Sequence, residues 1–132
     1  MLNNFKVRTK SRNDFIDITN EINNLVKNSR IKNGLCVVYV PHTTAGVFIN
    51  ENADPTVPTD INNILDKLIP WKADYRHLEG NSAAHLKTIL TGSDVQIIIE
   101  NNKLILGTWQ GIFFAEFDGP RERTILIKLI EG

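Results

Sequence analysis

The sequence predicts an α+β fold, and three observations indicate this class. Apolar and polar residues alternate in segments near both ends of the chain, as they do in half-buried strands. Two segments in the middle instead space their apolar residues three and four positions apart, as amphipathic helices do. The 132 residues are 42% hydrophobic and 23% charged, so the chain can bury a core. Without an internal repeat or a long linker, residues 1–132 should form a single domain.

The first forty residues predict two strands, a helix and a third strand. Residues 5–9 and 15–18 flank a Ser-Arg-Asn-Asp turn, so we expect them to pair as a hairpin. Thr19 is the predicted cap of a helix whose apolar face is formed by Ile22, Leu25 and Val26. Residues 35–40 form an apolar, β-branched run, which indicates a central strand covered on both faces.

The middle of the chain predicts another strand and two helices. A strand is expected over residues 45–49. Apolar residues between positions 57 and 69 then follow helical spacing, and Pro58 suits a first turn, so this helix should begin near Thr56. A second helix is predicted for residues 82–90, ended by a glycine, with a buried face made of Ala83, Leu86, Ile89 and Leu90.

The last forty residues predict three or four antiparallel strands. Two asparagines that tolerate the positive φ of a tight turn occupy positions 101 and 102. Counting outward from this turn predicts the pairs Glu100–Lys103, Ile99–Leu104 and Ile97–Leu106. Residues 112–117 and 124–130 should pair around a second turn, Asp118-Gly119-Pro120.

Charge and composition exclude several classes of function. The 15 basic and 15 acidic residues give a formal net charge of zero, whereas proteins that bind nucleic acid usually carry a basic excess. No segment reaches the roughly 20 apolar residues of a membrane span, and the polar N-terminus lacks the pattern of a signal peptide. We therefore expect a cytoplasmic protein with no nucleic-acid or membrane partner. The single Cys36 lies in an apolar run that suppresses the thiolate, so we interpret it as a core residue.

Three histidines with polar neighbours are the candidate site. His42 follows the predicted central strand and precedes Thr43 and Thr44, which makes a compact hydrogen-bonding platform, although the segment can equally be a polar turn. His77 lies in a polar loop that leads to the start of a helix, where free amides favour an anion. His85 lies one turn into that helix, on the border of its buried face, where a purely structural role is the alternative.

The residues leave the ligand of these histidines open between a metal ion and a phosphate. Zinc often uses three protein ligands and an open position for water. The spacing of eight between His77 and His85 is not a known zinc pattern, however, and imidazoles with hydroxyls and helix-terminal amides suit a phosphate equally well.

Further polar residues stand near these segments in the sequence. Glu51 and Asp54 can orient an imidazole, act as a base or hold a cation, or they are only a solvated residue and the start of a turn. Within Gly107-Thr108-Trp109-Gln110-Gly111, Trp109 can line a pocket or pack in the core, and Gln110 can bond a ligand. Arg121 is a candidate for binding a phosphate through two N–H groups of its guanidinium, or it is part of a hairpin turn.

Three segments resemble the YjbQ family, small bacterial and archaeal proteins described as secondary thiamine-phosphate synthase enzymes. They are HTTAGVFINENADPTV from His42, YRHLEGNSAAHLK from Tyr75 and LGTWQGIFFAEFDGPRER from Leu106. They occur in family order and cover most of the chain, whereas the first forty residues match only in general pattern. The resemblance implies an α+β fold with mixed, largely antiparallel sheets, two or three helices and a homotrimer. It also implies one pocket containing His42, His77 and His85, with Glu51, Asp54, Glu79, Asn81 and Gln110 as neighbours.

The leading hypothesis is an enzyme for a small phosphorylated substrate. The activity that the resemblance implies joins a pyrimidine pyrophosphate to a thiazole phosphate, which gives thiamine phosphate and pyrophosphate, as a secondary activity. The metal or phosphate ligands would be His42, His77 and His85, with zinc or magnesium as the possible ion. The candidate catalytic residues are Glu51, Asp54, Glu79 and Gln110, and the candidate substrate-binding residues are Thr43, Thr44, Asn81, Trp109 and Arg121. The alternatives are a non-catalytic module that binds a phosphorylated metabolite or metal, and a structural protein whose motifs maintain an interface.

Overall fold

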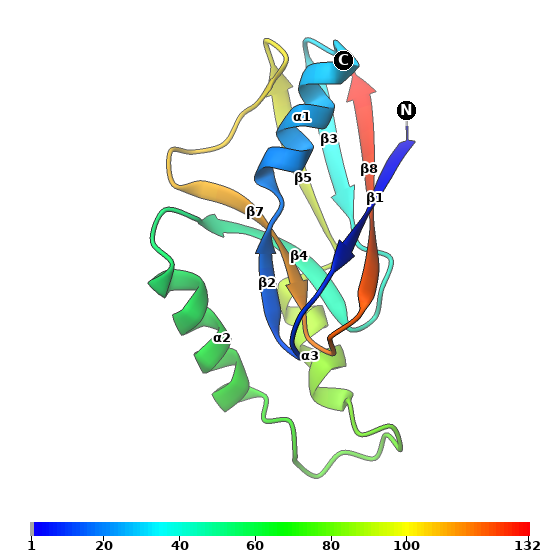
Figure 1. The fold of residues 1–132 in the computed structure, drawn as a ribbon, viewed down its shortest axis with the longest axis vertical. Coiled ribbons are helices and arrows are strands. Elements are labelled where there is room, and N and C mark those ends of the chain that lie inside the picture. Colours follow the sequence, from blue (N-terminus) through cyan, green and yellow to red (C-terminus); the bar gives the residue numbers. More distant parts are fainter. Residues whose placement is uncertain (1) are drawn as a thin grey trace.

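A computed structural model describes residues 2–132 as two antiparallel sheets and three helices (Figure 1). The elements are β1 (Leu2–Arg8), β2 (Asp14–Asp17), α1 (Thr19–Ser29), β3 (Gly34–Tyr39), β4 (Ala45–Glu51), α2 (Thr56–Leu68), α3 (Ser82–Thr91), β5 (Asp94–Glu100), β6 (Lys103–Leu104), β7 (Gln110–Glu116) and β8 (Glu122–Glu131). One sheet has the order β1-β8-β3-β5-β6 and the other the order β2-β7-β4. The α+β class is confirmed, and every strand pairing among residues 2–132 is antiparallel.

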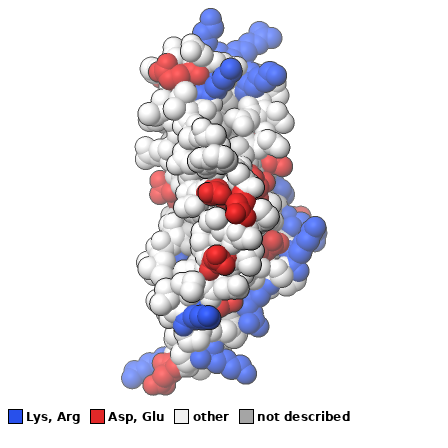
Figure 2. All heavy atoms as spheres, turned by 90° about the vertical axis from the view of Figure 1, so that its left-hand side faces the viewer, with Lys and Arg blue, Asp and Glu red and all other residues white. Residues whose placement is uncertain are grey.

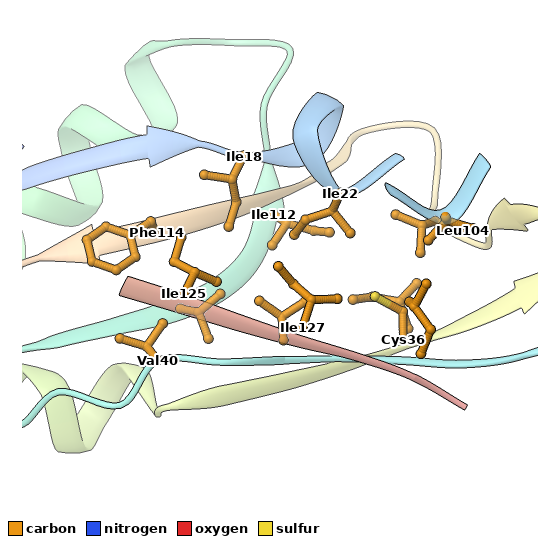
Figure 3. Packing of buried hydrophobic residues seen from close by; sticks show 14 of the residues in the cluster. Ile18, Ile22, Cys36, Val40, Leu104, Ile112, Phe114, Ile125 and Ile127 are labelled. Atoms are coloured by element: carbon orange, nitrogen blue, oxygen red, sulfur yellow. The ribbon is translucent and has the colours of Figure 1, made fainter. Parts of the chain in front are cut away.

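The main core lies between the two sheets and under α1 (Figure 3). Ile125 and Ile127 of β8 meet Ile112 and Phe114 of β7, and Ile22 of α1 packs into the same cluster. All five side chains are fully buried. Both sheets therefore contribute to this core. A second, smaller cluster is formed by Ala84, Ala115 and Phe117.

The two hairpins predicted around residues 11–14 and 118–120 are wrong. β1 pairs with β8, and β2 pairs with β7, so each short connection crosses from one sheet to the other. The two crossings lie against each other, since Thr9 N donates to Arg121 O at 2.8 Å and Gly119 N donates to Arg12 O at 3.0 Å. An alternating pattern indicates which face of a strand is buried but not which strand pairs with it. The turns between neighbouring strands were therefore a poor guide to strand pairing.

Two local predictions were wrong in detail. Thr19 begins α1, but its side chain does not cap the helix: the hydroxyl donates to Asp17 Oδ1 and accepts from Ile112 N at 2.9 Å. The turn at Asn101 and Asn102 is confirmed by φ values of 52° and 60°. The pairs Glu100–Lys103 and Ile99–Leu104 are also confirmed, but the pair Ile97–Leu106 is not, because the ladder ends at residue 104.

Two elements expose apolar side chains that the sequence predicted to be buried. β3 is central, between β8 and β5, yet only one of its faces is covered: Cys36 and Val38 are buried, whereas Leu35 and Tyr39 are exposed. On α3 the buried residues are Ala83, Ala84, Lys87 and Thr88. The predicted buried face is therefore wrong except at Ala83, since Leu86 is exposed and Ile89 and Leu90 are 75% and 64% exposed. Small side chains face the sheet because α3 packs closely on β4, where a Cβ added to Gly46 would lie 2.4 Å from the Gly92 carbonyl oxygen.

The helix α2 begins at Thr56, as predicted, and stands beside the two sheets (Figure 1). None of its residues is fully buried, and Leu68 is 69% exposed. Figure 2 views the molecule from this side and shows a broad uncharged surface, with acidic groups across the middle and Lys and Arg at both ends. No helix within residues 2–132 is long and apolar enough to cross a membrane.

Candidate functional site

His77 and His85 lie together at the start of α3. Their ring centroids are 5.5 Å apart, and the rings meet edge to face. The segment before the helix folds back to bring them together, since Gly80, with a φ of +78°, donates its amide to His77 O at 3.2 Å. Tyr75 anchors the preceding part of the loop, because its hydroxyl donates to Pro70 O at 2.6 Å.

The two imidazoles line an open hollow of about 580 Å³, which we call the His77–His85 hollow; its walls are Asp74, Tyr75, Arg76, His77, Ser82, His85 and Leu86. Arg76 brings a permanent positive charge and Ser82 a hydroxyl at the first position of α3, a helix of ten residues. The positive end of the helix dipole adds to the attraction for an anion. Two acidic groups oppose it, since Asp74 lines the hollow and Glu79 Oε1 lies 3.8 Å from His77 Nε2. The Arg76 guanidinium, the Ser82 hydroxyl and the helix start are the features that suit an oxyanion.

His42 lies elsewhere in the same chain and does not line this hollow. It follows β3, and its Nε2 accepts a hydrogen bond from Thr124 N at 3.0 Å, near the start of β8. Burial lowers the pKa of His42 below its usual 6.5, and the nearby Arg123 guanidinium lowers it further. One chain thus brings together two of the three histidines, and a pocket that contains all three stays a prediction that requires His42 from another copy.

The described part of one chain does not form a metal site. Within residues 2–132, no group of three or more His, Cys, Asp or Glu side chains is placed so that it could hold a metal ion. Structural zinc needs four protein ligands and catalytic zinc three, so the His77–His85 pair alone does not fit either kind of site.

A buried ion pair that the sequence analysis missed lies behind His42. Glu116 is fully buried at the end of β7; it accepts from Arg123 Nε at 2.8 Å, from Arg123 Nη2, from Thr9 Oγ1 at 2.9 Å and from Asp118 N at 2.9 Å. Arg123 Nη2 also donates to the hydroxyl of the buried Thr44 at 2.9 Å. Thr44 therefore supports this network, while Thr43 is exposed beside His42. The signal in the sequence was a lone carboxylate inside the apolar run of residues 112–117.

Asn81 and Arg121 meet at one carboxylate. Asp118 Oδ2 accepts from Asn81 Nδ2 at 2.9 Å and from Arg121 Nη2 at 2.8 Å, so the start of α3 is tied to the β7–β8 connection. Arg121 keeps about half of its side chain exposed. Asn81 is 93% buried, and its Oδ1 has no hydrogen-bond partner among residues 2–132. Both residues thus hold structure in one chain, and only Arg121 reaches solvent with its charge.

Glu51, Asp54, Trp109 and Gln110 lie at the far end of β4 from Thr44. Glu51 is the register partner of Gln110, and the seven residues of β4 separate it from Ala45 by about 20 Å. Gln110 Oε1 accepts from Gly107 N at 2.8 Å, so it closes its own turn. None of the four lines the His77–His85 hollow.

The surroundings of Asp54 and Trp109 are given by their hydrogen bonds and exposure. Asp54 Oδ1 accepts from Thr56 Oγ1 at 2.7 Å and from Thr56 N at 2.9 Å, which fixes the start of α2, and these bonds lower the pKa of Asp54. Trp109 is 63% exposed and does not pack in the core. Contact of these residues with the histidines stays a prediction, and it would have to occur between copies.

The outcome for Cys36 agrees with the sequence. The thiol is fully buried on β3, and burial raises its pKa to about 12. A thiol with that pKa is not a nucleophile at neutral pH.

Comparison with known proteins identifies the family of this chain. The family model described as "UPF0047 protein YjbQ-like" matches residues 3–132. A UPF0047 protein of Methanocaldococcus jannaschii is 53% identical over 98% of this chain and 94% of its own, and the UPF0047 protein YugU of Bacillus subtilis is 48% identical over 98% and 99%.

Solved structures agree with these relatives. A YjbQ/UPF0047 family protein of Clostridium acetobutylicum has 55% identity and a TM-score of 0.95, over 96% of this chain and 98% of its own. A hypothetical protein of Aeropyrum pernix has 36% identity and a TM-score of 0.95, over 100% and 99%. Sequence and fold therefore agree along the whole described chain, which belongs to the YjbQ-like UPF0047 family.

Proposed function

We propose that this protein is an enzyme for a small phosphorylated substrate, whose phosphate or pyrophosphate group binds in the His77–His85 hollow. The observation that carries the proposal is that His77 and His85, whose rings are in contact, line one open hollow at a helix start together with Arg76 and Ser82. These groups are hydrogen-bond donors or can become donors, as phosphate oxygens require.

The activity to test first is the synthesis of thiamine phosphate from a pyrimidine pyrophosphate and a thiazole phosphate. In this reaction a carbon–oxygen bond to pyrophosphate breaks, and a bond from the thiazole nitrogen to the same carbon forms. Negative charge grows on the departing pyrophosphate, so donors fixed around it stabilise the transition state more than the bound substrate. His77, His85 and Arg76 are the residues that would provide this stabilisation, in a protein that we expect to act in the cytoplasm.

A divalent metal does not enter this proposal as a step. One chain provides the two imidazoles of the hollow and no third ligand beside them that completes a metal site among residues 2–132. A three-histidine site for zinc or magnesium would therefore require assembly with other copies. The phosphate hypothesis instead uses groups that a single chain already brings together.

We also propose that the protein is a homotrimer, and its exposed apolar side chains support an assembly. Leu86, Ile89 and Leu90 cover the outer face of α3, and Leu35, Tyr39, Ile98 and Ile130 lie on the uncovered face of the five-stranded sheet. Leu35 is the register partner of both Ile98 and Ile130, so these three exposed side chains are neighbours on the sheet. Exposed apolar side chains that gather on one face are typical of interfaces. Sedimentation equilibrium should give three times the chain mass, and Ile98→Lys should lower it; a monomeric wild-type protein would contradict the assembly.

The decisive experiment measures turnover and ligand binding in the same preparations. Purified wild-type protein, His77→Ala, His85→Ala and the exposed α2 variant Lys67→Ala are incubated with both substrates, and thiamine phosphate is quantified by chromatography. We expect product from wild type and Lys67→Ala, and none from the two histidine variants with unchanged circular dichroism. Wild-type turnover in both histidine variants would refute the site. Saturable pyrophosphate binding without product would instead indicate the non-catalytic binding module.

A further inference from the structure

We propose that His42 is a fixed hydrogen-bond donor that binds an acceptor oxygen of an anionic ligand through Nδ1–H, and that it is not a metal ligand. The inference deepens the proposed function, because it assigns the ligand chemistry of the one histidine that lies outside the His77–His85 hollow. It rests on the hydrogen bond between Thr124 N and His42 Nε2.

The hydrogen bond decides where the imidazole carries its proton. A backbone amide can only donate, so the Nε2 that accepts from Thr124 at 3.0 Å holds a lone pair and no hydrogen. The neutral ring carries one hydrogen, which is then on Nδ1. A nitrogen that carries a hydrogen has no lone pair for a metal ion, and the other nitrogen is already engaged with the backbone.

The acceptor bond is held in place by the surrounding network. Thr124 follows Arg123, whose guanidinium is bound to the buried Glu116 and to the Thr44 hydroxyl, and Thr124 also pairs with Lys6 of β1. Thr44 in turn is two residues after His42. The backbone on both sides of the ring is therefore anchored to one buried ion pair, so the ring and the amide do not move independently.

The charges around His42 favour an anion as its ligand. The Lys6 ammonium donates to Thr124 Oγ1 at 2.7 Å and acts electrostatically on the imidazole, as Arg123 does. Glu116 opposes them, but its carboxylate is saturated by hydrogen bonds from Arg123, Thr9 and Asp118. Because the Glu116 charge is paired with Arg123, the exposed Lys6 ammonium leaves positive charge near the ring, and this suits a phosphate or carboxylate oxygen as the acceptor for Nδ1–H.

The first test reads the tautomer directly in the wild-type protein. Long-range ¹H–¹⁵N correlation spectra of ¹⁵N-histidine-labelled protein distinguish a ring protonated on Nδ1 from one protonated on Nε2, and His42→Gln assigns the signals. At neutral pH we expect the Nδ1–H form for His42. Added zinc chloride should leave the His42 tautomer unchanged. An Nε2–H ring, or a His42 tautomer that zinc changes, would overturn the proposal whether or not the protein has synthase activity.

The second test uses two variants that keep opposite halves of the imidazole. The amide nitrogen of His42→Asn takes the place of Nδ1 and can still donate, whereas His42→Gln places its amide near Nε2 and loses the donor. Calorimetric titration with sodium pyrophosphate should show binding to His42→Asn within about threefold of wild type, and a loss of about tenfold or more in His42→Gln, the range for a hydrogen bond to a charged group. Equal affinity of His42→Gln and wild type would refute the donor role, and so would an equal loss in both variants while circular dichroism shows both folded.

Discussion

Replacing Arg123 by methionine should leave the carboxylate of Glu116 buried without its cation. Glu116 is fully buried and the Arg123 side chain is 6% exposed, so water cannot take the place of the guanidinium without opening the structure. The substitution removes the bonds from Arg123 Nε and Nη2 to Glu116 and the bond from Nη2 to Thr44. The volume of the side chain is largely kept by methionine, so the loss of charge is the main change.

The size of the effect follows from these bonds. Removing one partner of a buried ion pair costs about 3–5 kcal/mol. Thr9 Oγ1 and Asp118 N still donate to Glu116 in the variant. The expected loss in the free energy of unfolding is therefore in the lower half of this range, about 3–4 kcal/mol. At about 2.1 cal/mol/K of unfolding entropy per residue, this lowers the Tm of 132 residues by roughly 10–15 °C.

The assay is guanidinium denaturation at neutral pH, followed by tryptophan fluorescence and circular dichroism at one protein concentration. The matched control is Arg8→Met, since Arg8 pairs with Glu122 at 3.4 Å with side chains that are 79% and 53% exposed. An exposed pair contributes about 0–1 kcal/mol, so this variant should stay near wild type. If Arg123→Met were no less stable than Arg8→Met, the assignment of Glu116–Arg123 as a buried ion pair would be refuted.

Three further predictions concern packing, reactivity and pH. Gly46→Ala should lose about 1–3 kcal/mol in the same denaturation assay, because its Cβ would lie 2.4 Å from the Gly92 carbonyl oxygen, whereas Gly132→Ala, with nothing within 4 Å, should be neutral. Cys36 should not react with a thiol reagent in the native protein and should react fully in denaturant; fast native labelling would contradict its burial. The depressed pKa of His42 means that the unfolded chain gains a proton first as the pH falls below 6.5. Stability should therefore decrease as the pH falls below about 6.5, and less steeply in His42→Gln; equal slopes would contradict this reasoning.

The sequence predicted the local elements well, whereas one chain brings together only part of the predicted site. The start of α2 at Thr56 followed from Pro58, and the tight turn at Asn101 and Asn102 followed from the tolerance of asparagine for positive φ. His77 and His85 were expected together, and the fold brings them within 5.5 Å. The family resemblance implied that Glu51 and Asp54 are neighbours of these histidines. Within one chain Glu51 lies at the other end of β4 from Ala45, so contact between copies stays a prediction.

The burial of α3 shows why a helical pattern can mislead. Leu86, Ile89 and Leu90 fit the apolar face of an amphipathic helix, yet the structure turns them outward and buries Lys87 against Asp66. A pattern of apolar residues indicates a face that avoids water, and it does not state whether the same chain or another copy covers that face.

The sequence by itself determined the secondary structure class, the bounds of α2 and α3, the β5–β6 turn and the inert state of Cys36, because each depends on neighbours a few residues away. Only the tertiary structure decided that β1 pairs with β8, that β2 pairs with β7 and that Glu116 forms an ion pair with Arg123. Strand alternation, which repeats every two residues, is the same for any partner, so the choice belongs to the packing of both sheets around one core. The tautomer of His42 has the same origin, since its proton is placed by an amide that lies 82 residues away in the chain.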